Sequence, residues 1–443
     1  MRILSITAGA AGMYCGSCFR DNALAAELLR RGHDVTLMPV YTPTRTDEEN
    51  VSEPSVLFGG ISVYLQQRSA LFRHLPRVFD RMWDAPSVIR ALTARSLSTD
   101  PQLLGDLTVS TLEGGDGVLK REFDKLIDWA DGEPRPDVVI LPNSLLIAMA
   151  EPLRRALGCP VCCTLQGEEL FINGLPETYR DRALALIRRQ VSQVDQFIAV
   201  SDYCARFMGG YLAIPEDRMS VVPLGISLAG YEPRQPGTGR FTIGYFARVA
   251  PEKGLHALAE AYIRFRALTR GAPVALEAAG YLAPAHEPYL VGVRRTLDDA
   301  GLGAEFAYRG AVDREGKLAF LRGLDVLSVP ATYDEPKGLF LLEAMGSGVP
   351  VVVPRRGALE EIVDRTGGGV LVPPDDPHSL AQALYDLWRD RPTVDRLGAR
   401  ALAGVREHYT IARSADALLE VLGRVATPVG ADPVGRRTSA SVH

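Results

Sequence analysis

Ile3-Leu4-Ser5-Ile6-Thr7-Ala8-Gly9 opens the chain with the pattern of a buried strand that runs into a glycine-rich turn. Over residues 19–31 the apolar positions recur at helical spacing, and Gly32 ends that pattern. Residues 33–40 then have the composition of a second strand. The order strand, glycine-rich turn, helix, strand predicts the start of a doubly wound α/β domain.

The same kind of unit recurs through the first half of the chain. Short apolar runs followed by loop or helix residues occur at 137–142, 161–165, 196–201 and 219–223. These runs predict one domain over residues 1–226. The next segment, 227–240, is the predicted linker because its second half is rich in proline and glycine.

The pattern starts again after the linker and predicts a second α/β domain over residues 241–405. Strand-like runs lie at 241–246, 274–280, 324–330, 349–354 and 369–372. Two successive units of this kind predict a cleft between the carboxyl ends of their strands, where ligands of such folds bind. Residues 427–443 are small and polar, and we expect a disordered tail.

The composition is that of a globular protein with two large domains. The 443 residues are 47% hydrophobic and 23% charged, and the formal net charge of -5 argues against nucleic-acid binding through a basic field. The N-terminal apolar run is too short for a signal peptide, and no apolar run reaches the about 18 residues of a membrane span. Six cysteines are too sparse for a disulfide framework, so we expect a cytoplasmic location.

The stretch from Tyr333 to Pro350 places two carboxylates, Glu335 and Glu343, eight residues apart around the point where a helix is predicted to begin. Free backbone N–H groups of Gly338 and Leu339 are then available to a phosphate. Hydrogen-bond acceptors on both sides of a phosphate site suit a sugar nucleotide, which has hydroxyl groups at both ends of its diphosphate. The alternative is an ordinary helix start with acidic residues nearby.

A basic motif follows the first strand of the second domain, between Gly244 and Gly254. Arg248 and Lys253 in this motif would bring two positive charges to a leaving diphosphate, where negative charge grows as the glycosidic bond breaks. Arginine grips phosphate as a planar fork and lysine as a point charge, so the pair would replace a metal ion. A solvated basic loop is the alternative interpretation.

These segments, together with Leu341-Leu342-Glu343-Ala344-Met345 and Gly348-Val349-Pro350-Val351-Val352, resemble glycosyltransferase family 4. The resemblance implies the GT-B fold, in which two Rossmann-like doubly wound domains face each other across a cleft. It implies an acceptor-binding first domain, a nucleotide-sugar-binding second domain, and a helix over residues 406–426 that returns to the first domain. It also implies that Glu335 binds hydroxyl groups of the donor sugar and Glu343 those of the ribose.

The loop over residues 8–18 resembles the glycine-rich loop of GT-B glycosyltransferases, and Gly12 and Gly16 would let the backbone approach donor and acceptor. Cys15 and Cys18 in this loop leave open a redox dithiol or half of a metal site. We favour buried or packing thiols, because Cys159, Cys162 and Cys163 are expected toward the opposite edge of the sheet.

Three positions depart from the family pattern, and one of them is Leu224, which stands in place of the asparagine of a Pro-Asn-Gly turn. Members often have histidine after the strand equivalent to residues 161–165, whereas this chain has Gln166, which cannot shuttle a proton and is assigned only to positioning donor or acceptor. Lys337 replaces the phenylalanine common before Gly338.

The resemblance implies a retaining hexosyltransferase that needs no metal or other cofactor and uses a UDP-, GDP- or ADP-linked sugar. In this mechanism a donor phosphate oxygen accepts the proton of the acceptor, while the protein positions the substrates and excludes water. Glycoside hydrolysis, nucleotide-sugar epimerisation, phosphorolysis and non-catalytic sugar-nucleotide binding are the alternatives. Residues 58–64 faintly resemble glycogen and starch synthases, which adds glucan elongation to these alternative functions.

Residues 68–95 interleave arginines with large apolar residues. This pattern is typical of a basic amphipathic segment at an anionic lipid surface. Because Pro76 and Pro86 interrupt it and Asp80 and Asp84 dilute its charge, we favour internal packing or gating of the acceptor over peripheral membrane contact. Small-molecule, glycan and lipid-linked acceptors all stay open.

Overall fold

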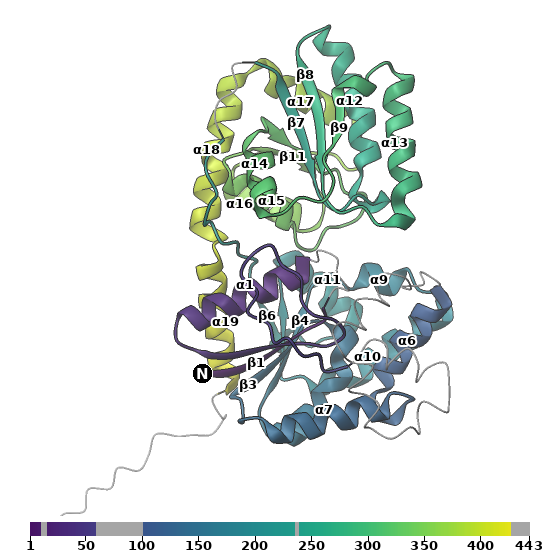
Figure 1. Ribbon diagram of the computed structural model, residues 1–443, viewed down its shortest axis with the longest axis vertical. Helices are drawn as coiled ribbons and strands as arrows, with labels where there is room; N and C mark the ends of the chain where they lie inside the picture. The colour runs from purple at the N-terminus through teal and green to yellow at the C-terminus, as the bar shows by residue number, and fades with distance from the viewer. Residues whose placement is uncertain (10–15, 59–100, 235–238, 427–443) are drawn as a thin grey trace, which may run out of the picture.

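The computed structural model describes residues 1–9, 16–58, 101–234 and 239–426, and the side chain of residue 101 is outside this description. Two α/β domains lie one above the other, with the N-terminus in the lower domain (Figure 1). The prediction of two doubly wound domains is confirmed. The tail, the segment 68–95, Gly12 and Cys15 lie outside the described residues.

The first domain contains a parallel six-stranded sheet in the order β2-β1-β3-β4-β5-β6 among the described residues. Its strands are β1 (Arg2–Thr7), β2 (Asp34–Pro39), β3 (Val138–Leu141), β4 (Val161–Leu165), β5 (Gln196–Ala199) and β6 (Met219–Val221). Strand β1 pairs with both β2 and β3, so Ile3 is opposite Val35 on one side and Val138 on the other. Every residue of β3 and β4 is buried, as expected for parallel strands with both faces covered.

Successive residues of β1 point to opposite faces of this sheet, and each face has its own core. Ile3 belongs to a cluster with Leu24 and Leu28 of α1 (Gly16–Arg30) and Leu418 of α19 (Ile411–Ala426), whereas Leu4 belongs to the main core. The helices of this domain are α1 (Gly16–Arg30), α6 (Pro101–Glu113), α7 (Lys120–Gly132), α8 (Ala150–Leu157), α9 (Glu169–Asn173), α10 (Glu177–Gln190) and α11 (Asp202–Leu212).

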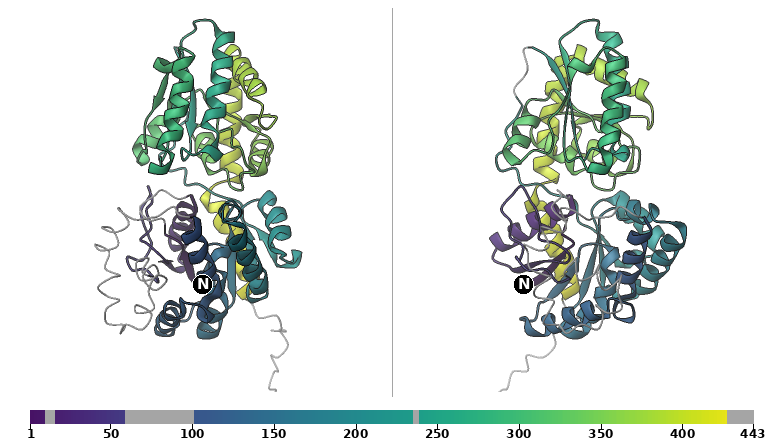
Figure 2. Two further views of the ribbon diagram at one scale, coloured as in Figure 1. Left: turned by 90° about the vertical axis from the view of Figure 1, so that its right-hand side faces the viewer. Right: turned by 45° about the vertical axis from the view of Figure 1, so that its right-hand side comes forward.

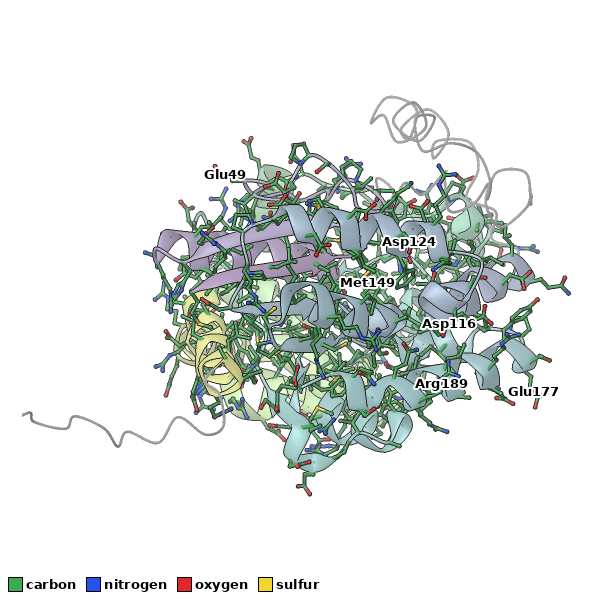
Figure 3. The ribbon with its side chains drawn as sticks, turned by 90° about the horizontal axis from the view of Figure 1, so that it is seen from below. Glu49, Asp116, Asp124, Met149, Glu177 and Arg189 are labelled. Carbon is green, nitrogen blue, oxygen red and sulfur yellow. The ribbon has the colours of Figure 1, made fainter. Side chains whose placement is uncertain are left out.

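Figure 3 shows the molecule from below, on the side of the first domain. Glu177 and Arg189, at the two ends of α10, are exposed, whereas Met149 lies in the core. Across the described ranges, no helix has both the length and the apolar content that a membrane crossing requires.

The second domain contains another parallel six-stranded sheet, in the order β12-β11-β10-β7-β8-β9, within the described residues. The strands are β7 (Phe241–Phe246), β8 (Val274–Ala279), β9 (Phe306–Tyr308), β10 (Val326–Leu327), β11 (Val351–Pro354) and β12 (Gly369–Val372). The helices are α12 (Leu255–Thr269), α13 (Glu287–Asp299), α14 (Arg314–Arg322), α15 (Leu339–Gly346), α16 (Gly357–Thr366), α17 (Pro377–Arg389) and α18 (Arg391–His408).

The chain crosses between the domains a second time near its end. After α18, Tyr409 and Thr410 lead into α19 (Ile411–Ala426), which packs against α1 and β3 of the first domain. Figure 2 shows α18 along the second domain and α19 along the first. We expected the returning helix to begin at residue 406, but α18 continues to His408 and the break falls where Thr410 pairs with Ile226.

Several predicted element boundaries differ from the structure. The run 324–330 gives only the short strand β10, and the edge strand β9, whose residues are only half-buried, was not predicted. The first helix begins at Gly16 rather than residue 19. Cys162 and Cys163, expected toward the opposite edge of the sheet from the glycine-rich loop, lie on β4, which is two strands from β1 and inside the sheet between β3 and β5.

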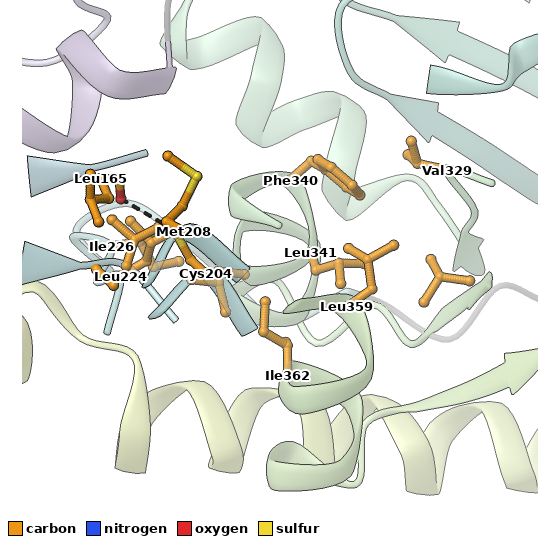
Figure 4. Close-up of a cluster of buried hydrophobic side chains, with 14 of the residues drawn as sticks. Leu165, Cys204, Met208, Leu224, Ile226, Val329, Phe340, Leu341, Leu359 and Ile362 are labelled. Atoms are coloured by element: carbon orange, nitrogen blue, oxygen red, sulfur yellow. Dashed lines mark hydrogen bonds between the residues drawn. The ribbon is translucent and has the colours of Figure 1, made fainter. Parts of the chain in front are cut away.

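A continuous hydrophobic core joins the domains along a surface that we call the interdomain seam. On the first domain the seam comprises the start of α1, residues 165–169 and α11; on the second it comprises residues 332–338, α15 and α16. Figure 4 shows side chains of both domains in one buried cluster, such as Leu165 and Met208 beside Leu341 and Ile362.

Candidate active site

The loop over residues 332–338 is held in place by its backbone. Thr332 N donates to Glu252 O at 2.9 Å, which fixes the loop against the turn after β7. Gly338 has φ +73° and caps α15, and a Cβ atom there would lie 2.7 Å from Ile362 Cδ1. Glycine is therefore required at the point where the loop becomes a helix.

Glu335, Lys253 and Tyr333 form a compact buried group. Lys253 Nζ donates to the Glu335 carboxylate and lies 2.6 Å from the Tyr333 hydroxyl, which itself donates to Glu335 Oε2 at 2.5 Å. The Lys253 ammonium also lies 4.9 Å from the centre of the Tyr333 ring. Two predicted catalytic residues that are 82 positions apart in sequence are thus in direct contact.

The Glu335 carboxyl is ionised at neutral pH despite its burial. Burial raises its pKa, but the charge of Lys253 and the hydrogen bonds from Lys253 and Tyr333 outweigh that effect and lower the pKa to about 2. The backbone N–H groups of Lys337 and Gly338 point at Oε1 from 3.3 and 3.4 Å. Glu335 can therefore only accept hydrogen bonds at neutral pH.

Arg248 lies in the same turn as Lys253 but has a different environment. Its guanidinium pairs with Glu252 at 2.5 Å and is 47% exposed. Tyr245 OH donates to the Arg248 carbonyl oxygen at 3.1 Å and fixes the backbone of the turn. An exposed guanidinium leaves Arg248 accessible to a ligand, although it does not share the hydrogen bonds of Glu335.

Glu343 belongs to a second polar cluster. Its Oε1 atom lies 2.7 Å from Lys317 Nζ, and Lys317 lies 2.6 Å from Asp47 of the first domain. The Tyr231 hydroxyl approaches the same Glu343 oxygen at 3.5 Å. The predicted ribose-binding carboxylate is thus held by a buried cation that also links the domains.

Two helix N-termini meet at the interdomain seam. A Cβ atom on Gly16, at the start of α1, would lie 3.8 Å from Leu339 Cδ2, at the start of α15. Beside this contact, Lys337 Nζ donates to Ser17 Oγ at 3.0 Å across the seam. The structure therefore brings Gly16, Gly338 and Leu339 together, with the Lys337 ammonium beside them.

Gln166 lies on the first-domain side of the seam and is buried. Its Nε2 atom donates to Pro142 O at 2.9 Å, while its Oε1 atom is buried without a partner among the described residues. The following residue, Gly167, has φ +91°, and a Cβ atom there would lie 2.3 Å from Pro336 Cγ. Glycine is thus required at position 167, because any side chain there would collide with Pro336 of the second domain.

A cavity between the domains is lined by both of them, including Asp202 and Lys337. No group of three or more histidine, cysteine or acidic side chains suited to a metal ion occurs in the part of the chain that the structure describes. Cys18 accepts a long contact of 3.9 Å from Thr7 Oγ1, and Cys159, Cys162, Cys163 and Cys204 are buried free thiols. Burial raises the pKa of Cys159 to about 11, so this thiol is unreactive at neutral pH.

The prediction from sequence missed several residues of the site. Tyr333 was quoted within the motif but given no role, and Lys337 was noted only as a departure from the family pattern. Lys317 and Asp47 gave no local signal, because a buried ion pair between distant elements has no sequence motif. Tyr333 could have been found from its position two residues before Glu335.

The comparisons with known proteins cover both domains. Residues 22–225 match the family described as glycosyl transferase 4-like domain, and residues 232–403 match glycosyl transferases group 1. A 2-deoxystreptamine N-acetyl-D-glucosaminyltransferase of Streptomyces fradiae is 30% identical over 63% of this chain and 72% of its own. A glycogen synthase of Mycobacterium tuberculosis is 27% identical over 67% of this chain and 70% of its own.

Solved structures show the same fold. Sucrose-phosphate synthase of Thermosynechococcus elongatus aligns with a TM-score of 0.69 and 17% identity over 96% of this chain and 98% of its own. HepE of Anabaena, solved with UDP and glucose, aligns with a TM-score of 0.66 and 16% identity over 96% of this chain and 100% of its own.

The two-domain fold and these matches define a glycosyltransferase of the GT-B class. The chain belongs to the glycosyltransferase family that joins a 4-like domain to a group 1 domain, which confirms the resemblance to family 4.

Proposed function

We propose that this protein transfers a hexose from a nucleotide diphosphate sugar to an acceptor hydroxyl group, with retention of anomeric configuration and without a metal ion. The observation that supports it best is the meeting of the α1 and α15 N-termini at the seam, beside Lys337 and the Lys253–Glu335 pair. Helix N-termini and cations beside them attract a diphosphate.

Three positive side chains act on the leaving group in this proposal, and two of them, Lys253 and Arg248, are also paired with carboxylates. Lys253 and Lys337 approach from the second domain at the seam, and Arg248 is half-exposed in the neighbouring turn. Fixed cations stabilise the negative charge that develops on a leaving diphosphate. This arrangement supports transfer without a metal, and we expect activity to persist in EDTA.

Glu335 is suited to bind hydroxyl groups of the donor sugar. Since its pKa is about 2, it accepts hydrogen bonds at neutral pH and holds no proton to donate. A glycosidase needs one carboxyl group that stays protonated to act on the leaving oxygen, so Glu335 does not fit that role. Glu343, fixed by Lys317, is proposed to bind the ribose.

The acceptor is proposed to be a polyhydroxylated ring or chain. Relatives named for 2-deoxystreptamine, D-inositol 3-phosphate and glycogen all point to such molecules. Glucan elongation is the second candidate function, and the match to a glycogen synthase over 67% of this chain favours it. The buried free thiols support a cytosolic location.

Thermal shift with UDP-, GDP- and ADP-linked sugars tests the donor site. We expect one nucleotide to raise the Tm of the wild-type protein and to raise that of Lys253→Ala much less. Incubation of the best donor with 2-deoxystreptamine, D-inositol 3-phosphate and maltotriose, followed by NMR of the product, then gives the acceptor class and the anomeric configuration. An unchanged Tm with every nucleotide would refute the proposal, and an inverted product would refute retention.

A further inference from the structure

Glu169, the first residue of α9, has a buried carboxyl group that the donor site does not use. Only 7% of this residue is exposed, and its Oε2 atom has no hydrogen-bond partner among the described residues. The neighbouring Glu168 is different, because it accepts from Ser144 Oγ at 2.7 Å and from Gln166 N at 2.8 Å. Buried polar atoms are nearly always satisfied, so an unpartnered carboxylate oxygen indicates a missing donor.

The groups around Glu169 place it at the seam. Lys337 and Glu335 act on its charge from the second domain, and Glu168 acts on it from its own loop. Tyr203 and Tyr211 of α11 lie close enough for the Glu169 charge to raise their pKa values, after the larger effects of burial at both and of Asp334 at Tyr203. Glu169 therefore faces the donor-site loop from the first domain.

An aromatic surface continues from this carboxyl group along α11. The rings of Tyr203, Phe207 and Tyr211 stack in sequence, with centroid separations of 5.8 and 5.6 Å. Phe207 is 36% exposed, and Phe171 on α9 is 38% exposed. Tyr211 OH donates to Asn173 Oδ1 at 2.8 Å, which ties α11 to the end of α9.

We propose that the Glu169 carboxyl group binds a hydroxyl group of the acceptor and so positions the acceptor against the donor, with the α11 aromatic surface as the adjoining wall. Small-molecule sites usually combine an apolar wall with a few convergent polar groups. A hydroxyl group supplies the donor that Oε2 lacks. This inference rests on the proposed function and adds an acceptor-contacting residue to it.

The binding should depend on pH. Burial is the main reason why the pKa of Glu169 is raised to about 7. The backbone N–H of Glu169 and the Lys337 ammonium lower this pKa, whereas the Glu168 and Glu335 carboxylates raise it further. The ionised carboxylate accepts a charge-assisted hydrogen bond from a hydroxyl group, which is stronger than a neutral one. The KM for the acceptor should therefore fall as pH rises through about 7.

The test compares Glu169→Ala and Glu169→Gln with Glu27→Gln as the matched control. Glu27 is equally buried at 7% but is bonded to Arg30 and Arg31. For each protein we would measure the Tm shift with the preferred nucleotide, the KM for whichever panel acceptor the wild type uses, and hydrolysis of the donor by water.

Glu169→Ala should raise the acceptor KM by about ten- to a hundredfold, because it loses a hydrogen bond to a charged group. It should also slow hydrolysis of the donor, in which water occupies the acceptor position. Glu169→Gln should remove the pH dependence near 7. The nucleotide Tm shift should match the wild type in both variants, and Glu27→Gln should match it in every measurement.

The outcomes separate the two proposals. A wild-type protein that responds to no nucleotide contradicts the proposed function itself. If the wild type binds nucleotide and hydrolyses the donor, but the Glu169 variants keep its acceptor KM, hydrolysis rate and pH profile, the role of Glu169 is wrong while the donor site stands.

Discussion

Lys317 Nζ lies 2.7 Å from Glu343 Oε1, and both side chains are almost fully buried, with exposures of 7% and 10%. The same ammonium group lies 2.6 Å from Asp47 on the other domain. One buried cation therefore orients the proposed ribose-binding carboxylate and holds the domains together. The proposed nucleotide contact and the domain contact therefore share Lys317.

Lys317→Met should destabilise the protein strongly, because it leaves two carboxylates buried without a counter-charge. We expect a loss of about 3–5 kcal/mol in the free energy of unfolding, measured by urea denaturation. Arg314→Gln is the control, since Arg314 also reaches the first domain, to Glu48 at 2.9 Å, but both side chains are about a quarter exposed. That variant should lose less than about 1 kcal/mol, and equal losses in the two variants would contradict the prediction.

The pH dependence of stability should reveal the low pKa of Glu335. A carboxyl group whose pKa is lowered in the folded state stabilises the fold above its unfolded pKa and loses that contribution as pH falls through the folded value. Since the folded pKa is about 2, the contribution, about 3 kcal/mol, should be complete above about pH 5 and fade toward pH 2.

Denaturation of the wild type and Glu335→Gln at pH 7, 5, 4 and 3 would measure this effect. The wild type should be the more stable at pH 7, and the difference should shrink steadily below about pH 4.5, the range in which the unfolded carboxyl group titrates. A difference that stays constant from pH 7 to pH 3 would show that Glu335 is not held ionised by Lys253 and Tyr333.

Gly167→Ala tests how closely the domains must approach. A Cβ atom at this position would meet Pro336 Cγ at 2.3 Å, in addition to the strain of φ +91°. Gly271→Ala is the control, because Gly271 has φ +82° but no atom within 4 Å of the added Cβ. Both variants should lose about 1–2 kcal/mol to backbone strain, and Gly167→Ala should in addition lose most of its transfer activity. Equal activity in the two variants would show that this contact is dispensable.

Much of the fold could be predicted from sequence because parallel strands covered on both faces are continuous apolar runs. The predicted bounds of the strands 161–165, 241–246 and 369–372 are those of β4, β7 and β12. The edge strand β9 escaped prediction because its apolar run is only three residues long and is only half-buried. Its pairing with β8 decides its conformation, and that is a long-range property.

The sequence predicted the site residues that stand in motifs, but not the contacts between distant segments. Glu335 and Lys253 stand in recognisable motifs, but their contact joins residues 82 apart, and that of Lys337 with Ser17 joins residues 320 apart. Glu168 and Glu169 look alike in sequence. Only the structure shows that Ser144 and Gln166 satisfy the first, whereas the second lacks a partner for Oε2 among the described residues.

Lys337→Gln should weaken the donor site while leaving the fold intact. Glutamine keeps an N–H donor on a side chain one bond shorter, so the main loss is the positive charge beside the meeting helix N-termini. Removing one fixed cation from a developing diphosphate charge should lower kcat by about ten- to a hundredfold and reduce the nucleotide Tm shift. Lys120→Gln, a change of the same charge at a lysine that is 69% exposed on α7, should match the wild type in both measurements. The measurement is kcat from steady-state kinetics at saturating acceptor. An unchanged kcat in Lys337→Gln would contradict the prediction. It would assign this lysine to domain contact alone and leave charge stabilisation to Lys253 and Arg248.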